Sequence, residues 1–281
     1  MYSHSKLERF RVSKEELTKL GNEFNSEAMP MLEPLHNTTF WILLNNKFTK
    51  KIVKQTFFEA IENCNVTKNQ ADWQSWILRI WMREILDYYV KRENDVQTIF
   101  DFIDNTEVDS NQITTFFTPD ELKSGLTENE FVKYLVKLPA VLRIPMIMKE
   151  IHSLTYEKIA ELIDVPLGVI ATRIYRARKL LYLLFDENFQ YEEEKKKWSQ
   201  KESTNNIFEL RKCALLVDGE IALEQDPKFT ELVNVDNRFK NELMIQNSIK
   251  KLIKSSTSDS TFRNSLKQRI EKKANKKFNQ K

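Results

Sequence analysis

The chain has 281 residues, of which 41% are hydrophobic and 30% charged, so it can bury at least one core; its net charge of +3 does not single out a partner. With only 4 glycines and 7 prolines, it lacks the turn chemistry of β-sandwiches and barrels, since glycine alone usually makes up roughly 7% of a chain. The 2 cysteines and 3 histidines exclude a disulfide scaffold and a cysteine-rich zinc site, no glycine-rich phosphate loop occurs, and we therefore expect an all-α protein.

Several classes of function are excluded by the same inspection. We find no nucleophile–base pair, carboxylate dyad or metal-ligand cluster, so we expect no enzymatic activity, no cofactor and no metal. The N-terminus is charged throughout and lacks the apolar core of a signal peptide. The longest apolar run, Leu180–Phe185, is far shorter than the roughly 20 residues that span a bilayer. We therefore expect a cytoplasmic protein with no membrane partner.

Apolar pattern and charge divide the chain into segments. We expect an N-terminal extension at 1–27, an aromatic helical domain at 28–92, an acidic linker at 93–130, a second helical domain at 131–187, a linker at 188–205 and a C-terminal helical unit at 206–281. Residues 93–130 carry ten acids against one base, whereas residues 250–281 carry eleven bases against two acids. Opposite charges of this kind indicate that the two segments meet different partners.

Residues 28–92 repeat apolar side chains at three- and four-residue spacing. Three such faces follow one another, and the last and longest contains Trp73, Trp76, Ile77, Ile80, Trp81, Ile85 and Tyr88. Three amphipathic helices with faces of this kind can close the core of a bundle.

Residues 138–184 carry the most specific pattern. Thr155 is the expected N-cap of a short helix, Tyr156–Ile163, which ends in a tight turn before a longer helix starts near Leu167. Ala160 is small at the point where these two helices must cross closely. The spacing predicts a helix-turn-helix, in which the second helix enters the major groove of DNA.

The second of these helices carries four cations, Arg173, Arg176, Arg178 and Lys179. Such side chains bind DNA phosphates, and one near the start of the helix can read a guanine edge. The alternative is an ordinary helical hairpin whose basic face is only solvated.

The sequence LPAVLRIPMIM…LTYEKIAELIDVPLGVIATRIYRARKLL resembles region 4 of the sigma-70 family of RNA polymerase sigma factors, in particular the extracytoplasmic-function type. In that family this domain reads the −35 promoter element. The resemblance implies that the following residues contact DNA: Val169, Ala171, Thr172, Arg173, Tyr175, Arg176 and Lys179. Val169 and Ala171 depart from the family pattern and leave fewer groups that can bond a base edge.

The aromatic domain resembles region 2 of the same family through AMPMLEPLHNTTFWILLNNKFTKKIVKQTFFEAI and through WILRI at 76–80. In the family, region 2 melts DNA and captures flipped bases of the −10 element. Aromatic rings beside cations suit that task, because stacking one base contributes roughly 1–3 kcal/mol. The resemblance gives these candidates: Lys68, Asn69, Trp76, Arg79, Trp81, Arg83 and Tyr88. The alternative is that tryptophans at helical spacing, above all Trp73 and Trp76, belong to the core.

By resemblance, the partners are promoter DNA and the RNA polymerase core, through its clamp helices and flap. The candidate polymerase-binding residues are Ile52, Val53, Lys54, Gln55 and Phe58. Where the family has an acidic pair and a glutamine, this chain has Lys50, Lys51 and Lys54, which reverses the local charge. Either the partner surface has changed with it, or apolar contacts carry the binding, or the binding is weak.

The acidic linker has two interpretations. In this family the segment between regions 2 and 4 threads the RNA channel of the polymerase, where ten carboxylates can mimic an RNA backbone. The alternative is a linker that merely stays solvated.

Residues 207–254 lie outside the sigma resemblance. Their sequence VDGE at 217–220 is weakly similar to the N-terminal domain of anti-sigma factors, which often bind zinc; Cys213 alone cannot, so the resemblance implies a metal-free version. One hypothesis is autoinhibition, in which this unit folds back on region 2 or region 4. The alternative is a plain helical extension. By resemblance, a further partner is either an anti-sigma factor or this extension itself.

Together these patterns predict a sigma factor that directs core polymerase to promoters through contacts at the −10 and −35 elements. The rival hypothesis is a stand-alone helix-turn-helix regulator that binds duplex DNA without polymerase. That rival would account for the lysines on the helix that faces the clamp.

Overall fold

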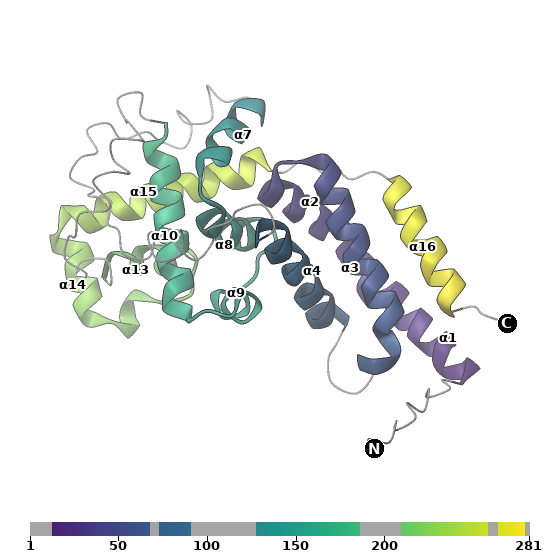
Figure 1. Ribbon diagram of the computed structural model, residues 1–281. Helices are drawn as coiled ribbons and strands as arrows, with labels where there is room; N and C mark the ends of the chain where they lie inside the picture. Colours follow the sequence, from purple (N-terminus) through teal and green to yellow (C-terminus); the bar gives the residue numbers. More distant parts are fainter. Residues whose placement is uncertain (1–12, 68–72, 91–127, 186–208, 258–263, 279–281) are drawn as a thin grey trace, which may run out of the picture.

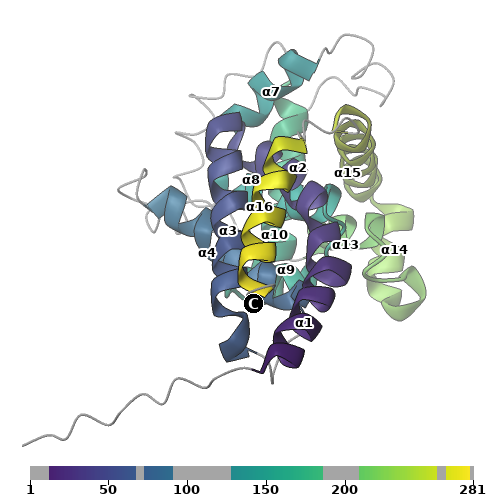
Figure 2. The ribbon, with the colours of Figure 1, turned by 90° about the vertical axis from the view of Figure 1, so that its right-hand side faces the viewer.

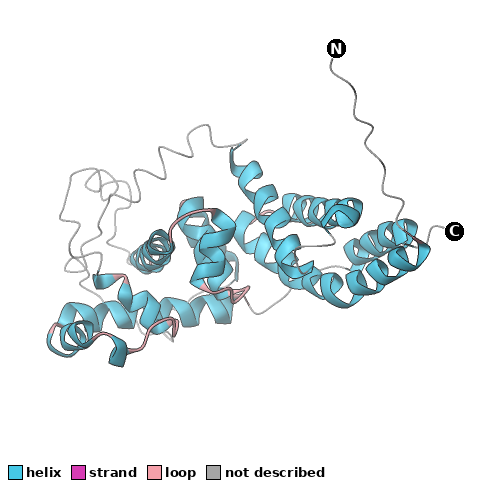
Figure 3. Ribbon diagram, turned by 90° about the horizontal axis from the view of Figure 1, so that it is seen from below, coloured by secondary structure: helices cyan, strands magenta, loops and turns pink. Residues whose placement is uncertain are grey.

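The computed structural model describes residues 13–67, 73–90, 128–185, 209–257 and 264–278. Within these ranges every regular element is a helix, so the predicted all-α class is confirmed (Figure 3). The α-helices are α1 (Lys14–Glu23), α2 (Leu32–Leu43), α3 (Asn46–Thr67), α4 (Trp73–Val90), α7 (Glu128–Lys137), α8 (Ala140–Glu150), α9 (Tyr156–Ile163), α10 (Leu167–Leu183), α13 (Lys212–Val217), α14 (Pro227–Val235), α15 (Asn237–Ser256) and α16 (Asn264–Phe278). None of the described helices is long and apolar enough to cross a membrane.

Helices α1 to α4 form the first body, with a π-helical turn and a 3-10 turn, Phe24–Ala28 and Met29–Met31, between α1 and α2. Phe24 lies at its centre, edge-on to Trp73 at 5.4 Å and to Phe57 at 6.4 Å between ring centroids. This aromatic cluster forms because the three helical faces predicted from the sequence all point inward.

Helices α7 to α10 form the second body, which contains the predicted helix-turn-helix. Thr155 caps α9 by accepting a hydrogen bond from the backbone N–H of Lys158 at 3.2 Å. Asp164 ends α9 in the left-handed region, with φ at 60°, and Pro166 stands at the N-cap of α10. These boundaries confirm the sequence prediction for both helices.

The C-terminal part of the chain reaches both bodies (Figure 1). We call residues 209–257, which contain α13, α14 and α15, the cover; it packs on α10 and has a small core of its own around Cys213, Phe229 and Phe239. Helix α16 instead lies along α3 and α1 of the first body (Figure 2). Its buried side chains include Phe278, which approaches Gly21 so closely that a Cβ there would lie 2.9 Å from the Phe278 Cβ.

The two bodies also touch each other directly. Helix α2 packs on α8, and α4 packs on α9. The buried side chains of both bodies therefore form one continuous apolar cluster, which α15 and α16 extend.

The burial of His36 makes the stability of the fold depend on pH. Burial, with a smaller contribution from Lys50, lowers the pKa of His36 from 6.5 to about 4, against the opposing effect of Glu33. Protonation therefore favours the unfolded chain: the contribution of neutral His36 is complete above about pH 6.5 and is lost as the pH falls towards 4.

We expect the free energy of unfolding to fall by up to about 1.4 kcal/mol per pH unit in this window, the slope of one proton. Urea unfolding of the wild type and of His36→Gln between pH 7 and pH 4.5 measures that slope. The variant should lose the part that His36 contributes. Parallel curves for the two proteins would contradict this assignment.

Candidate nucleic-acid interface

The second helix of the helix-turn-helix, α10, is covered on all sides. Every residue from Ile170 to Leu183 is buried. Helices α8 and α9 pack on one side of α10, as a helix-turn-helix requires, and α13 and α15 of the cover pack on the other. Figure 1 shows α10 between these two groups.

The residues predicted to contact DNA therefore lie inside the protein in this arrangement. Those that are buried are Ala171, Thr172, Arg173, Tyr175, Arg176 and Lys179, and Val169, near the start of α10, is half-buried. The expectation of an open DNA-binding face does not hold here, because the cover occupies it. DNA can reach these side chains only when the cover has moved away.

The cover neutralises the last cation of this face, Lys179. Glu242 of α15 lies 2.6 Å from the Lys179 Nζ, and the two side chains are 0% and 2% exposed. Next to this pair, the Gln246 side-chain amide donates to the backbone oxygen of Tyr175 at 3.1 Å. At the start of α10, Arg211 donates to the backbone oxygen of Gly168 at 3.2 Å. These contacts follow α10 along the length that the sequence assigns to DNA.

Arg178 is held by carboxylates from two different parts of the chain. Its Nε donates to Glu150 of α8 at 2.9 Å, and its Nη2 lies 2.9 Å from both oxygens of Asp218 in the cover. The Tyr156 hydroxyl donates to Asp218 at 2.7 Å, and Lys250 lies 2.9 Å from it. Arg178 is therefore part of a buried network and is not exposed to phosphates.

The electrostatics of this network favour charged partners. Burial raises the pKa of Asp218, but Arg178 and the hydrogen bonds from Tyr156 and Lys250 outweigh it, and the pKa ends below its usual value. Burial also raises the pKa of Tyr156 far above its usual value. Asp218 thus stays ionised where it meets the guanidinium.

The turn formed by VDGE, residues 217–220, places the Asp218 carboxylate against Arg178. Gly219 has a φ of 71°, a left-handed conformation that glycine adopts without strain, and Glu220, the residue after it, pairs with Lys149 of α8. Sequence reasoning singled out this segment but did not identify Asp218 and Glu242 as partners of α10. The sequence gives little indication of these pairs, because Asp218 and Glu242 lie 40 and 63 positions from Arg178 and Lys179.

The predicted DNA-melting residues of the first body are scattered. Trp76 is half-buried against Trp73, and Arg79 is exposed but pairs with Glu161 of α9 at 2.9 Å. Arg83 pairs with Glu59 of α3. Tyr88 is half-buried against Phe48, with ring centroids 5.2 Å apart, while Lys68 and Asn69 lie outside the described residues.

Trp81 is a core residue. Its side chain is fully buried, and its indole N–H donates to the Thr39 hydroxyl at 2.8 Å. The prediction that Trp81 stacks on a base does not fit this position. The sequence could not separate it from Trp76, because both tryptophans repeat at helical spacing along α4.

The predicted polymerase-binding residues flank an open groove between α3 and α4. Its volume is about 330 Å³, and its lining consists of Phe48, Lys51, Ile52, Gln55, Glu84, Asp87 and Tyr88. Gln55 is exposed, and Ile52 contributes the apolar floor. Val53 is fully buried in the core, which corrects its assignment as a contact residue. Lys54 and Phe58 stand together beside α16, with the Lys54 Nζ 5.8 Å and the Lys273 Nζ 5.3 Å from the Phe58 ring centroid.

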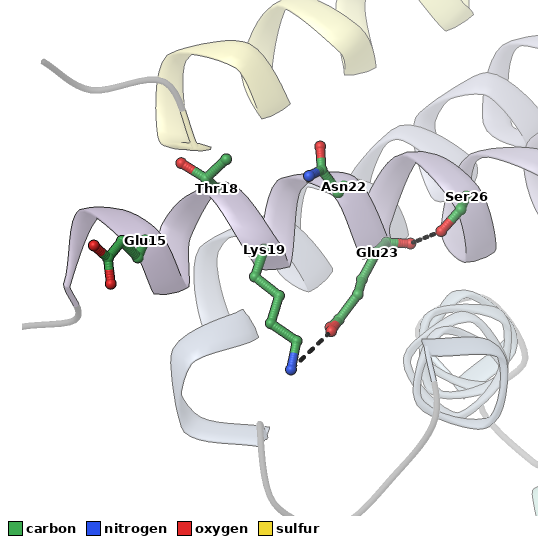
Figure 4. Close-up of a pocket in the computed structure, with 6 residues that line it drawn as sticks. All are labelled: Glu15, Thr18, Lys19, Asn22, Glu23 and Ser26. Carbon is green, nitrogen blue, oxygen red and sulfur yellow. Dashed lines mark hydrogen bonds and ion pairs between the residues drawn. The ribbon is translucent and has the colours of Figure 1, made fainter.

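A second hollow lies along α1 (Figure 4) and carries no comparable chemistry. All six lining side chains come from α1 and the turn after it, and the close-up shows them along that single segment. Lys19 pairs with Glu23 at 3.8 Å, and all of them except Glu23 are exposed. In the part of the chain that the structure describes, no group of His, Cys, Asp and Glu side chains could hold a metal ion.

Comparison with known proteins matches these features to one family. The family model described as sigma-70, region 4 matches residues 128–181, from α7 to α10. The ECF RNA polymerase sigma-E factor of Haemophilus influenzae is 23% identical over 133 residues, covering 46% of this chain and 70% of that protein. The protein of the same name from Escherichia coli K12 is 24% identical over 140 residues, with the same coverage.

Among solved structures, the sigma factor RpoE in complex with the anti-sigma factor NepR from Bartonella quintana matches with a TM-score of 0.43 and 21% identity, over 60% of this chain and 99% of that one. The similarity to sigma factors rests on the region 4 model and on the sequence relatives. Residues 128–181 thus match sigma-70 region 4, and the chain is similar to sigma factors of the extracytoplasmic-function type over about half of its length.

Proposed function

We propose that this chain is an RNA polymerase sigma factor whose C-terminal cover keeps it inactive until it is displaced. The helix-turn-helix of α9 and α10 would read the −35 element, and exposed residues of α4 would act at the −10 element. The observation that carries the proposal is the match of region 4 to a helix-turn-helix whose second helix bears four cations.

Docking on the polymerase core is supported by the groove between α3 and α4. The groove is open to solvent and combines the apolar side chains of Phe48, Ile52 and Tyr88 with charged groups of both signs. An apolar floor with a polar rim is the usual composition of a docking surface. Lys51, which reverses the family's charge, lies in the same groove as Glu84 and Asp87, so its charge is partly balanced locally.

Inhibition by the cover is supported by its contacts on α10. Binding to DNA requires Arg and Lys side chains to reach phosphates and base edges. In this arrangement the Glu242 carboxylate pairs with Lys179 as a DNA phosphate would. Helices α13 and α15 pack on the side of α10 that would enter the major groove of a duplex. The cover and the promoter therefore compete for one surface.

The same contacts make the cover sensitive to substitution. Removing one partner of a buried ion pair typically costs 3–5 kcal/mol, because the remaining charge stays buried and unpaired. Lys179 and Glu242 form such a pair. Opening the chain, in contrast, returns both side chains to water and leaves neither charge buried and unpaired.

The substitution Glu242→Lys tests inhibition in the full chain. It places a second cation beside Lys179, so we expect the cover to detach and promoter-dependent transcription with purified core polymerase to rise at least about tenfold. The matched control is Glu231→Lys, an exposed position of α14 in the same cover, which makes the same charge change and should leave transcription unaltered.

Unchanged or lower transcription by Glu242→Lys would refute inhibition by the cover. The sigma assignment itself is tested in the same assay by co-purification with the core. Specific binding to duplex DNA without any polymerase would instead support the stand-alone regulator.

The substitution Gln55→Arg tests the groove. Gln55 is exposed, so the fold should tolerate the larger side chain, which projects into the groove and should weaken binding to core polymerase at least about tenfold. Gln268→Arg, at an exposed position of α16, is the matched control. Equal core affinities of the two variants, measured by fluorescence anisotropy, would place the docking surface elsewhere.

A further inference from the structure

Besides the cover, a second contact holds the protein in its closed arrangement. It lies where the two bodies touch directly. Its centre is Arg143 of α8, whose side chain is only 8% exposed. The Arg143 Nε donates to the backbone oxygen of Ile42 at 2.9 Å, and its Nη2 donates to the Tyr89 hydroxyl at 3.1 Å. The Tyr89 hydroxyl in turn donates to the same oxygen of Ile42 at 3.0 Å. We call these three residues the Arg143 clasp.

The remaining donors of Arg143 stay within its own body. Its Nη1 donates to the backbone oxygens of Leu135 at 2.8 Å and Leu138 at 3.0 Å. One guanidinium thus links the end of α7 and the start of α8 to α2 and α4 of the first body. Because hydrogen bonds to a charged donor are stronger than neutral ones, this is a specific contact as well as an apolar one.

Further contacts continue the same interface along α2 and α4. The Thr38 hydroxyl lies 3.4 Å from the His152 Nδ1, and the His152 ring packs against Trp81 with centroids 6.1 Å apart. At the rim, Arg79 pairs with Glu161. The rim pair is exposed and adds little, so the buried centre carries most of the interaction.

The clasp conflicts with promoter binding as proposed above, on which this inference rests. The −10 and −35 elements lie about 25 bp apart, roughly 85 Å at 34–36 Å per turn of DNA. Here the body that would bind the first element and the body that would bind the second are joined by hydrogen bonds of 2.9 and 3.1 Å. Both elements cannot be occupied while these bonds persist.

We infer that the Arg143 clasp is a second lock, independent of the cover, that holds the two DNA-binding bodies together. Its hydrogen-bond partners all belong to the two bodies, so detachment of the cover leaves them in place. The chain opens for a promoter only after both closures have been released.

The test removes one hydroxyl from the clasp. Tyr89→Phe keeps the ring of this buried residue and deletes the hydroxyl that accepts from Arg143 and donates to the backbone oxygen of Ile42, while the direct bond from Arg143 to Ile42 remains. Tyr134→Phe is the matched control, since its ring packs on Phe185 within the second body, with centroids 4.5 Å apart. Spin labels on Gln74→Cys and Lys133→Cys report the distance between the bodies, because both positions are exposed and the native cysteines, Cys64 and Cys213, are buried.

In the full chain without polymerase or DNA, Tyr89→Phe should raise the ratio of open molecules, with a long label distance, to closed molecules, with a short one, by about threefold to tenfold. Tyr134→Phe should leave this ratio unchanged. The affinity of the holoenzyme for promoter DNA should rise by the same factor, because that factor is the gain in the binding-competent population. Combined with Glu242→Lys, the two gains should multiply, as expected for separate sites.

Identical distance distributions for the wild type and Tyr89→Phe would overturn the second lock. The second lock would also be overturned if Tyr89→Phe raised the affinity for promoter DNA in the wild type but not in the Glu242→Lys variant. The distance measurement needs no polymerase, so a failure of the sigma assignment, seen as no binding to core, is distinguished from a failure of the clasp.

Discussion

The buried guanidinium of Arg178 is the interaction on which the closed arrangement depends. It meets Glu150 from its own body and Asp218 from the cover. The two carboxylates are not equivalent. If the cover leaves, Glu150 still neutralises Arg178, so the helix-turn-helix keeps its buried charge balanced. Asp218 is kept ionised at its buried position by Arg178 and the groups around it, and in solvent it is ionised without them.

The closed chain buries α10 and leaves the groove of the first body exposed. Helix α10 lies under the cover, and the two bodies are joined at Arg143, yet the groove between α3 and α4 stays open. A ligand can shift a conformational equilibrium only by its difference in affinity for the two states. A partner that binds in the groove can therefore bind the closed form of the chain. Promoter DNA, which needs the open form, then shifts the equilibrium towards it. In this order the polymerase meets a chain that is not yet bound to DNA.

The helix-turn-helix could be predicted almost to the residue because its signals are local: a Thr155 cap, a left-handed Asp164 and a following Pro166. The burial of α10 could not. Lys179 has the same sequence signature whether its partner is a phosphate or Glu242, which lies 63 positions away. The role of Arg143 could not be predicted either. Its partner across the interface is the backbone oxygen of Ile42, and every residue type has such an oxygen.

The last turn of α4 serves two surfaces at once. Tyr88 lines the open groove, whereas the next residue, Tyr89, bonds Ile42 and Arg143, and the two rings lie edge to face with centroids 5.3 Å apart. The groove and the joint between the bodies are therefore separated by a single peptide unit, so a substitution that disturbs this turn alters both surfaces.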